Sequence, residues 1–163
     1  MSKTAKGRYA NIGSVSYGTL KDEELVDAFA SELAALYKYT GTKVPPHVKE
    51  MLATISQLDE IDYEDGDAGD LVGELMQELE HFAPPFCYFG SLEGDGADFG
   101  FWISPDAIRD AIHDGDLLVQ DDSRGGRQDD IEVDYTGLVY HVSDHGNESL
   151  HQYTRGQYSY TIW

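Results

Sequence analysis

The spacing of the apolar residues changes at Pro84-Pro85, and this change constrains the fold more than any other feature of the sequence. Before the two prolines, apolar residues recur three and four positions apart, which is typical of amphipathic helices. After them, aromatic-rich runs and strict alternation predict strands. Because proline interrupts a helix, the pair ends the last helix of the first half. Helices followed by strands predict an α+β fold.

Three helices are expected before the prolines. The first starts at Thr19, an N-cap with Asp22 three positions later, and ends before Gly41. Its buried stripe is Val26, Phe29, Leu33, Leu36 and Tyr37. The second helix opens at Pro45-Pro46, and the third covers residues 68–82.

An antiparallel sheet is expected after the prolines. Residues 86–89 and 99–103 predict an aromatic hairpin that closes through a long loop rich in glycine and acid. A short inserted helix follows Ser104-Pro105, and a short strand covers residues 117–120. The alternation from Leu138 to the end predicts a three-stranded meander. The N-terminal helices are expected to pack on one sheet made of the hairpin and the meander.

The length of 163 residues predicts a single domain over residues 1–163. Residues 1–18 are expected to form a loose basic arm or a short strand around residues 12–15, and residues 121–130 a mobile loop. Cys87 is the only cysteine, so an internal disulfide is excluded. The chain has no run of apolar residues long enough for a membrane span, and no apolar segment follows Lys3, Lys6 and Arg8 to make a signal peptide.

Most of the negative charge lies in one block. Between Asp59 and Asp122 there are nineteen acidic residues and one basic residue, Arg109, in a chain of net charge −20. Such a field attracts cationic surfaces and repels nucleic acid and anionic membranes. With 40% hydrophobic and 12% aromatic residues, the chain is too apolar for a disordered acidic tail. A folded acidic protein is expected.

The third predicted helix carries the candidate binding surface. Four carboxylates recur on the side away from its leucines, at Asp67, Asp70, Glu74 and Glu78. Steps of four residues place them roughly 6 Å apart along the axis, comparable with successive phosphates of a nucleic-acid strand. Like charges four apart destabilise a helix, so folding gains nothing obvious from this choice. The alternative is a solvated face that keeps the protein soluble.

Two acidic loops extend this surface in the prediction. The loop that leads into the third helix contributes Asp62, Glu64 and Asp65. The tip of the aromatic hairpin forms a second, separate acidic loop with Glu93, Asp95 and Asp98.

Enzymatic motifs and metal-site motifs are not found in the sequence. Placing Gly66 or Gly96 at the invariant glycine of an EF-hand puts Ile61 or Ser91 at the first ligand position. The six histidines form no metalloprotease pattern, and there is no phosphate-binding glycine loop and no nucleophile elbow. No catalytic residue, metal or cofactor is therefore predicted, and the chain is not expected to be an enzyme.

Three stretches resemble a known group of proteins. They are residues 12–20 (IGSVSYGTL), residues 83–90 with 93–102 (APPFCYFG and EGDGADFGFW), and residues 141–147 (HVSDHGN). Together they resemble small acidic proteins of unassigned function from bacteriophages, prophages and other mobile elements. The resemblance implies a setting in which short accessory proteins are often anti-defence factors, several of them acidic decoys of nucleic acid.

The sequence therefore predicts a non-catalytic inhibitor in the host cytoplasm that mimics nucleic acid. Its expected partner is a basic, nucleic-acid-binding protein of the host, such as a restriction, CRISPR or repair enzyme. Direct binding to nucleic acid or membranes is not expected, and a dimer remains open. Two alternatives stay open as well: an accessory protein whose acids only maintain hydration, and a small metal-dependent hydrolase that uses residues 93–98.

Overall fold

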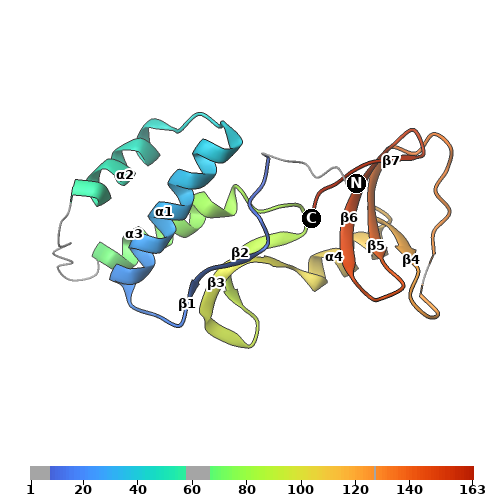
Figure 1. The fold of residues 1–163 in the computed structure, drawn as a ribbon, viewed down its shortest axis with the longest axis horizontal. Coiled ribbons are helices and arrows are strands. Elements are labelled where there is room, and N and C mark those ends of the chain that lie inside the picture. The colour runs from blue at the N-terminus through green and yellow to red at the C-terminus, as the bar shows by residue number, and fades with distance from the viewer. Residues whose placement is uncertain (1–7, 58–66, 127) are drawn as a thin grey trace. The chain divides into compact units, whose positions relative to one another are not determined.

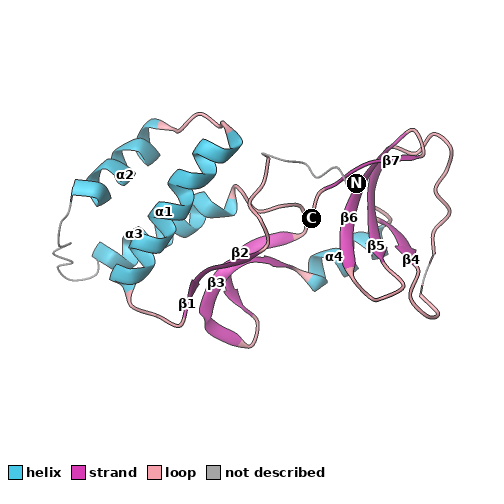
Figure 2. Cartoon of the chain, in the orientation of Figure 1, coloured by secondary structure: helices cyan, strands magenta, loops and turns pink. Residues whose placement is uncertain are grey.

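The computed structural model describes residues 8–57, 67–126 and 128–163 and confirms the α+β class. In these ranges the chain forms four helices, a three-stranded sheet and a four-stranded sheet (Figure 2). None of the described helices is both long enough and apolar enough to cross a membrane.

The chain divides into two compact units, and each is described by itself. The helical unit contains Gly7–Ala83 and Cys87–Ile103, and the C-terminal unit contains Pro84–Phe86 and Ser104–Trp163. The helical unit carries most of the charge, with nineteen acidic residues against five basic ones. That residues 1–163 fold as a single domain stays a prediction.

Three helices form the larger part of the helical unit (Figure 1). They are α1 (Asp22–Thr40), α2 (Pro46–Gln57) and α3 (Asp67–Glu80). Gly41 follows the last residue of α1 and caps the helix. It adopts the left-handed conformation with φ of 67°, which a residue without a Cβ reaches easily. The prediction of Thr19 as its N-cap was wrong. Lys21 holds that position, while the Thr19 hydroxyl accepts a hydrogen bond from the Lys21 backbone N–H at 3.1 Å.

The three-stranded sheet of this unit is antiparallel, in the order β1-β3-β2. Its strands are β1 (Gly13–Tyr17), β2 (Cys87–Leu92) and β3 (Asp95–Ile103). Strands β1 and β3 approach so closely that a Cβ on Gly100 would lie 2.1 Å from the carbonyl oxygen of Gly13. Glycine at position 100 is therefore what allows β1 to pair at this register.

The core of the helical unit is built around Phe29 of α1. Its ring meets the rings of Phe89 and Phe99 edge-on, with centroids 5.1 and 5.6 Å apart, and Phe89 packs in turn on Phe101 at 4.9 Å. This geometry is the one that aromatic rings prefer. The predicted stripe of α1 is confirmed, since each of its five residues is buried. The hairpin thus contributes Phe89, Phe99 and Phe101 to the core.

The C-terminal unit contains helix α4 and the four-stranded sheet. Helix α4 (Pro105–Asp114) begins after Ser104, whose hydroxyl accepts the Ala107 backbone N–H. The strands are β4 (Leu118–Asp121), β5 (Gly137–Val142), β6 (Glu148–Thr154) and β7 (Gln157–Thr161). Strands β5, β6 and β7 form the expected antiparallel meander, and β4 joins it parallel to β5.

Three predicted details differ from the structure or lie partly outside it. The hairpin and the meander belong to two sheets, where one was expected. Within residues 1–18, the strand expected around residues 12–15 is present as β1 but covers residues 13–17; residues 1–7 are not described. In the predicted mobile loop, the Asp129 carboxylate accepts the Val119 N–H at 3.0 Å, and the Asp129 N–H donates to the Val119 carbonyl at 2.7 Å. These bonds tie the described end of that loop to β4.

Replacing Phe29 by alanine should lower the free energy of unfolding of the helical unit by about 3–5 kcal/mol, because it leaves a cavity between α1 and the hairpin. Urea unfolding followed by circular dichroism measures the loss. The exposed Tyr39, also on α1, gives a matched control. A Tyr39→Ala variant as unstable as Phe29→Ala would contradict the role given to Phe29.

Candidate functional site

The exposed acidic surface of the helical unit joins residues of two helices. Asp67, Asp70 and Glu74 of α3 are exposed, as predicted from their spacing, and so are Asp22 and Glu23 of α1. A Cβ placed on Gly69 would lie 3.6 Å from a carboxylate oxygen of Asp22, so the first turns of α1 and α3 are neighbours. We call these five carboxylates the acidic end. The contribution of α1 was missed, because spacing within one helix cannot reveal which helix lies beside it.

The packing of α3 explains why its carboxylates face solvent. Its side chains Leu75 and Leu79 are fully buried in the core, which also includes the stripe of α1. Because an α-helix turns by about 100° per residue, Asp67, Asp70 and Glu74 lie roughly 80°, 140° and 100° away from Leu75 around the axis, all on one side of the leucine face. The leucines that hold α3 in place therefore also expose Asp67, Asp70 and Glu74.

In residues 8–57, 67–126 and 128–163, no lysine or arginine forms an ion pair with Asp67, Asp70 or Glu74. Lys21, which directly precedes α1, forms an ion pair with Glu24 at 3.3 Å. Hydrogen bonds from Thr19 and Lys21 hold the pKa of Glu24 below its usual value. The ammonium group of Lys21 is therefore already paired with Glu24, next to Asp22 and Glu23 of the acidic end.

Helix N-termini account for part of this acidity. Asp22, Glu23, Asp67 and Asp70 lie in the first turns of α1 and α3, where the helix dipole favours negative charge. Glu74 lies in the second turn of α3, beyond the reach of this effect. The dipole thus explains the acids in the first turns better than it explains Glu74.

Glu78 does not belong to the exposed row, contrary to the prediction. Its side chain is only 16% exposed and lies 2.8 Å from the Nε2 atom of His47 on α2. Burial and the charge of Glu78 together raise the pKa of Tyr37. A hollow of about 380 Å³ lies here, lined by His47, Met51, Glu74, Gln77 and Glu78. Glu78 therefore links α3 to α2, a contact between residues too distant in sequence for spacing to show.

The predicted acidic loop before α3 cannot be placed. Asp62, Glu64 and Asp65 lie outside the described residues. The structure therefore places four of the seven residues predicted for the main acidic surface, and three of these four are exposed.

The second predicted acidic loop is a short turn. Strand β2 extends to Leu92 and β3 starts at Asp95, which leaves only Glu93 and Gly94 between them. Glu93 is exposed, and the Asp95 carboxylate accepts the Ala97 backbone N–H at 3.2 Å. Asp98 is buried at 9% exposure within β3 and accepts a hydrogen bond from the hydroxyl of Ser14 on β1. Asp98 thus joins two strands and does not extend the acidic surface.

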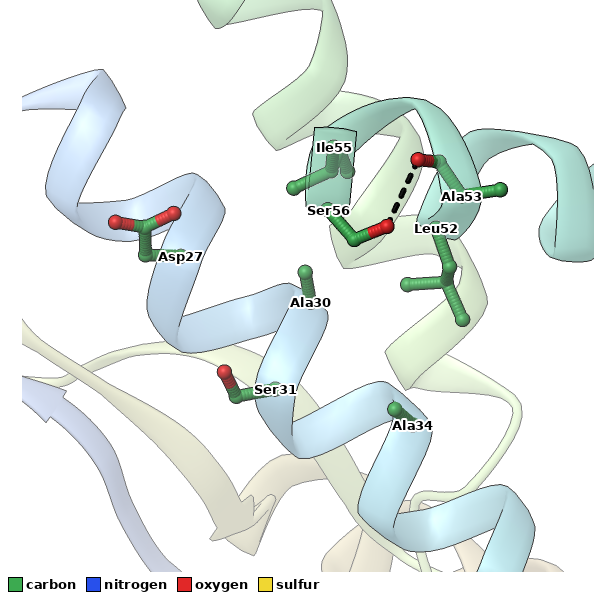
Figure 3. Close-up of a pocket in the computed structure, with 8 residues that line it drawn as sticks. All are labelled: Asp27, Ala30, Ser31, Ala34, Leu52, Ala53, Ile55 and Ser56. Carbon is green, nitrogen blue, oxygen red and sulfur yellow. Dashed lines mark hydrogen bonds between the residues drawn. The ribbon is translucent and has the colours of Figure 1, made fainter. Parts of the chain in front are cut away.

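A groove of about 590 Å³ lies between α1 and α2 (Figure 3). Its walls are mostly small side chains, and its only charged residue is Asp27. The lining residues are Asp27, Ala30, Ser31, Ala34, Leu52, Ala53, Ile55 and Ser56. Sequence reading missed the groove because alanine and serine on a helix carry no signal for a cavity.

A cluster of rings on the C-terminal sheet was also missed. His141 and His151 stack with centroids 5.1 Å apart, and Tyr158 meets His151 edge-on at 5.1 Å. His141 Nε2 lies 2.8 Å from the Asp122 carboxylate, and His151 Nε2 lies 3.0 Å from the Ser149 hydroxyl. Burial and the neighbouring His141 lower the pKa of His151. Within the described ranges, no three histidine, cysteine or acidic side chains are arranged to hold a metal ion.

Cys87 lies where its thiol stays protonated. Burial and the charge of Glu80 raise its pKa to about 12. Since the thiolate is the reactive form, the side chain behaves as a small apolar group at neutral pH. Glu80 itself accepts the Phe89 backbone N–H at 2.6 Å, so this carboxylate of α3 holds the start of β2.

Replacing Ser14 by alanine should lower the free energy of unfolding by about 1–3 kcal/mol, because the buried Asp98 carboxylate loses a hydrogen-bond donor. Urea unfolding measures the change. The same substitution at the exposed Ser91 of β2 serves as the control and should change stability by less than about 0.5 kcal/mol. Equal losses in the two variants would show that the Ser14–Asp98 bond contributes nothing specific.

The lowered pKa of His151 predicts a pH-dependent stability of the C-terminal unit. The usual pKa of histidine is 6.5. As the pH falls below this value, His151 binds a proton in the unfolded chain but stays neutral in the folded chain. Stability is therefore full above this pH and is lost as the pH falls toward the lower pKa of the folded state. Urea unfolding between pH 7.5 and 5.5 should show a smaller loss in His151→Gln than in the unmodified chain. A loss of the same size in both would refute the assignment.

The acidic end brings exposed carboxylates of α1 and α3 together, and such a surface suits binding to a cationic partner. The chain matches no protein-family model, no curated protein and no solved structure.

Proposed function

We propose that this chain is a non-catalytic acidic protein that binds the basic groove of a nucleic-acid-binding protein in place of nucleic acid. The observation that carries the proposal is the acidic end, where the Asp22 carboxylate lies beside Gly69, in the turn of α3 that also carries Asp67 and Asp70. A groove lined with lysine and arginine would bind this surface by electrostatic complementarity. The resemblance to small proteins of mobile elements adds the context, an anti-defence factor acting on a host restriction, CRISPR or repair enzyme.

The absence of lysine or arginine partners for the α3 carboxylates supports this proposal. Exposed acids that serve folding alone are commonly interleaved with lysine or arginine at helical spacing, because such pairs stabilise a helix by a few tenths of a kcal/mol. Asp67, Asp70 and Glu74 have no such cation among the described residues. Their mutual repulsion is relieved when a cationic partner binds.

Hydration alone is the second candidate function of the charge. The C-terminal unit is acidic as well, with exposed carboxylates at Asp110, Asp130, Glu132 and Asp134. A charge spread over both units favours a general role in solubility. The two candidates differ in one respect, because only the first assigns a special role to the acidic end.

Neutralising Asp67→Asn, Asp70→Asn and Glu74→Gln together should weaken binding to the target while leaving the fold intact. Each exposed ion pair lost costs about 0.2–1 kcal/mol, which for three pairs is roughly a threefold to hundredfold weaker complex at low salt. The measurement is capture from a nuclease-treated bacterial lysate, with release of the bound protein by duplex DNA and by added salt.

A matched control exists in the C-terminal unit. Asp130→Asn, Glu132→Gln and Asp134→Asn remove the same three charges from the same residue types at exposed positions. The proposal is supported if duplex DNA releases the captured protein and if only the acidic-end variant fails to capture it. Equal effects of both variants would favour hydration, and capture that DNA does not release would refute mimicry.

A further inference from the structure

The last residue of β1 and the connector that follows it to α1 (residues 18–21) hold two large apolar side chains in solvent. Tyr17 is 73% exposed and Leu20 is 67% exposed, the two highest values among the large apolar side chains that the structure describes in the helical unit. Single exposed apolar residues are ordinary on protein surfaces. Two of them three positions apart, directly before the acidic first turn of α1, form a combination that needs a separate explanation.

The connector is held by hydrogen bonds on both sides of Leu20. The Gly18 N–H donates to the Ala97 carbonyl of β3 at 3.0 Å. The Thr19 hydroxyl accepts the Lys21 N–H at 3.1 Å, and the Lys21 side chain is bound to Glu24 at 3.3 Å. The Leu25 N–H donates to the Lys21 carbonyl at 3.0 Å. A segment fixed in this way loses little conformational freedom on binding, which favours affinity.

Carboxylates follow the two apolar residues closely in the sequence, at the start of α1. Asp22 and Glu23 begin α1 immediately after Lys21, and Asp22 lies beside Gly69 at the start of α3. The apolar pair therefore borders the acidic end. Protein interfaces commonly combine a few large apolar anchors with a charged rim, and the anchors contribute most of the affinity.

We infer that Tyr17 and Leu20 are the apolar anchors of a protein–protein interface whose charged rim is the acidic end. The partner that fits has an apolar socket next to lysine or arginine side chains. This inference rests on the proposed function, because charge complementarity is what fixes the sign of the rim. The inference also goes beyond the proposed function, since a surface that only imitated nucleic acid would need no exposed leucine.

Two synthetic peptides test the inference with the unmodified chain. One alternates lysine and serine; the other has the same length and charge, with leucine in place of every second serine. Both should bind at low salt, and the leucine peptide should bind about tenfold more tightly, a difference of about 1.4 kcal/mol. Isothermal titration at two salt concentrations gives the affinities and their salt dependence.

Variants identify the residues responsible. Tyr17→Ser with Leu20→Ser should remove the preference for the leucine peptide and leave binding of the lysine–serine peptide unchanged. Tyr39→Ser, at a residue 51% exposed on α1, should leave the preference intact. Because the substituted side chains lie in solvent, all variants should unfold at the same urea concentration as the unmodified chain.

The outcomes separate this inference from the proposed function. Salt-dependent binding of both peptides with equal affinity would overturn the anchors and leave the acidic end in place. A preference that survives the double substitution, or that Tyr39→Ser abolishes as well, would also overturn the anchors. If neither peptide binds at low salt, the cationic partner and the anchors fail together.

Discussion

The packing of Phe29 against the hairpin is the contact on which the rest of the helical unit depends. It joins α1 to β2 and β3 through Phe89 and Phe99, segments that lie some sixty residues further along the chain. The leucines of α3 then pack into the same core. With α1 fixed to the sheet at one end of the connector and β1 paired with β3 at the other, residues 18–21 have little freedom.

This core offsets the cost of a strongly acidic surface. Nineteen acidic residues against five basic ones repel one another in the helical unit, and such repulsion destabilises a compact state. Some of its carboxylates are used inside the fold, since Asp98 binds Ser14, Glu78 binds His47 and Glu80 accepts the Phe89 backbone N–H. The carboxylates of the acidic end have no comparable role in folding. The structure thus separates acids that hold elements together from acids that only face solvent.

What the sequence could predict follows from the range of each interaction. The stripe of α1 and the alternation of the meander repeat within one element, so both were predicted correctly. Asp98 was assigned to a loop because aspartate and glycine are rare in strands, and its partner Ser14 is 84 residues away. Glu78 was predicted to lie on an exposed face because its partner, His47, lies 31 residues upstream, too far for spacing within α3 to reveal. The pairing of β4 with β5 and the proximity of Asp22 to α3 are likewise long-range.

Charge and apolar surface contribute differently to binding, and here they lie next to each other. Exposed carboxylates accelerate encounter with a cationic partner, but salt screens them and each exposed pair adds little to the lifetime of a complex. Apolar anchors act in the opposite way, because they are insensitive to charge at a distance and slow dissociation. Tyr17 and Leu20 precede Asp22 and Glu23 closely in the sequence, so the proposed partner, attracted by the carboxylates, would meet the two apolar side chains in a defined position.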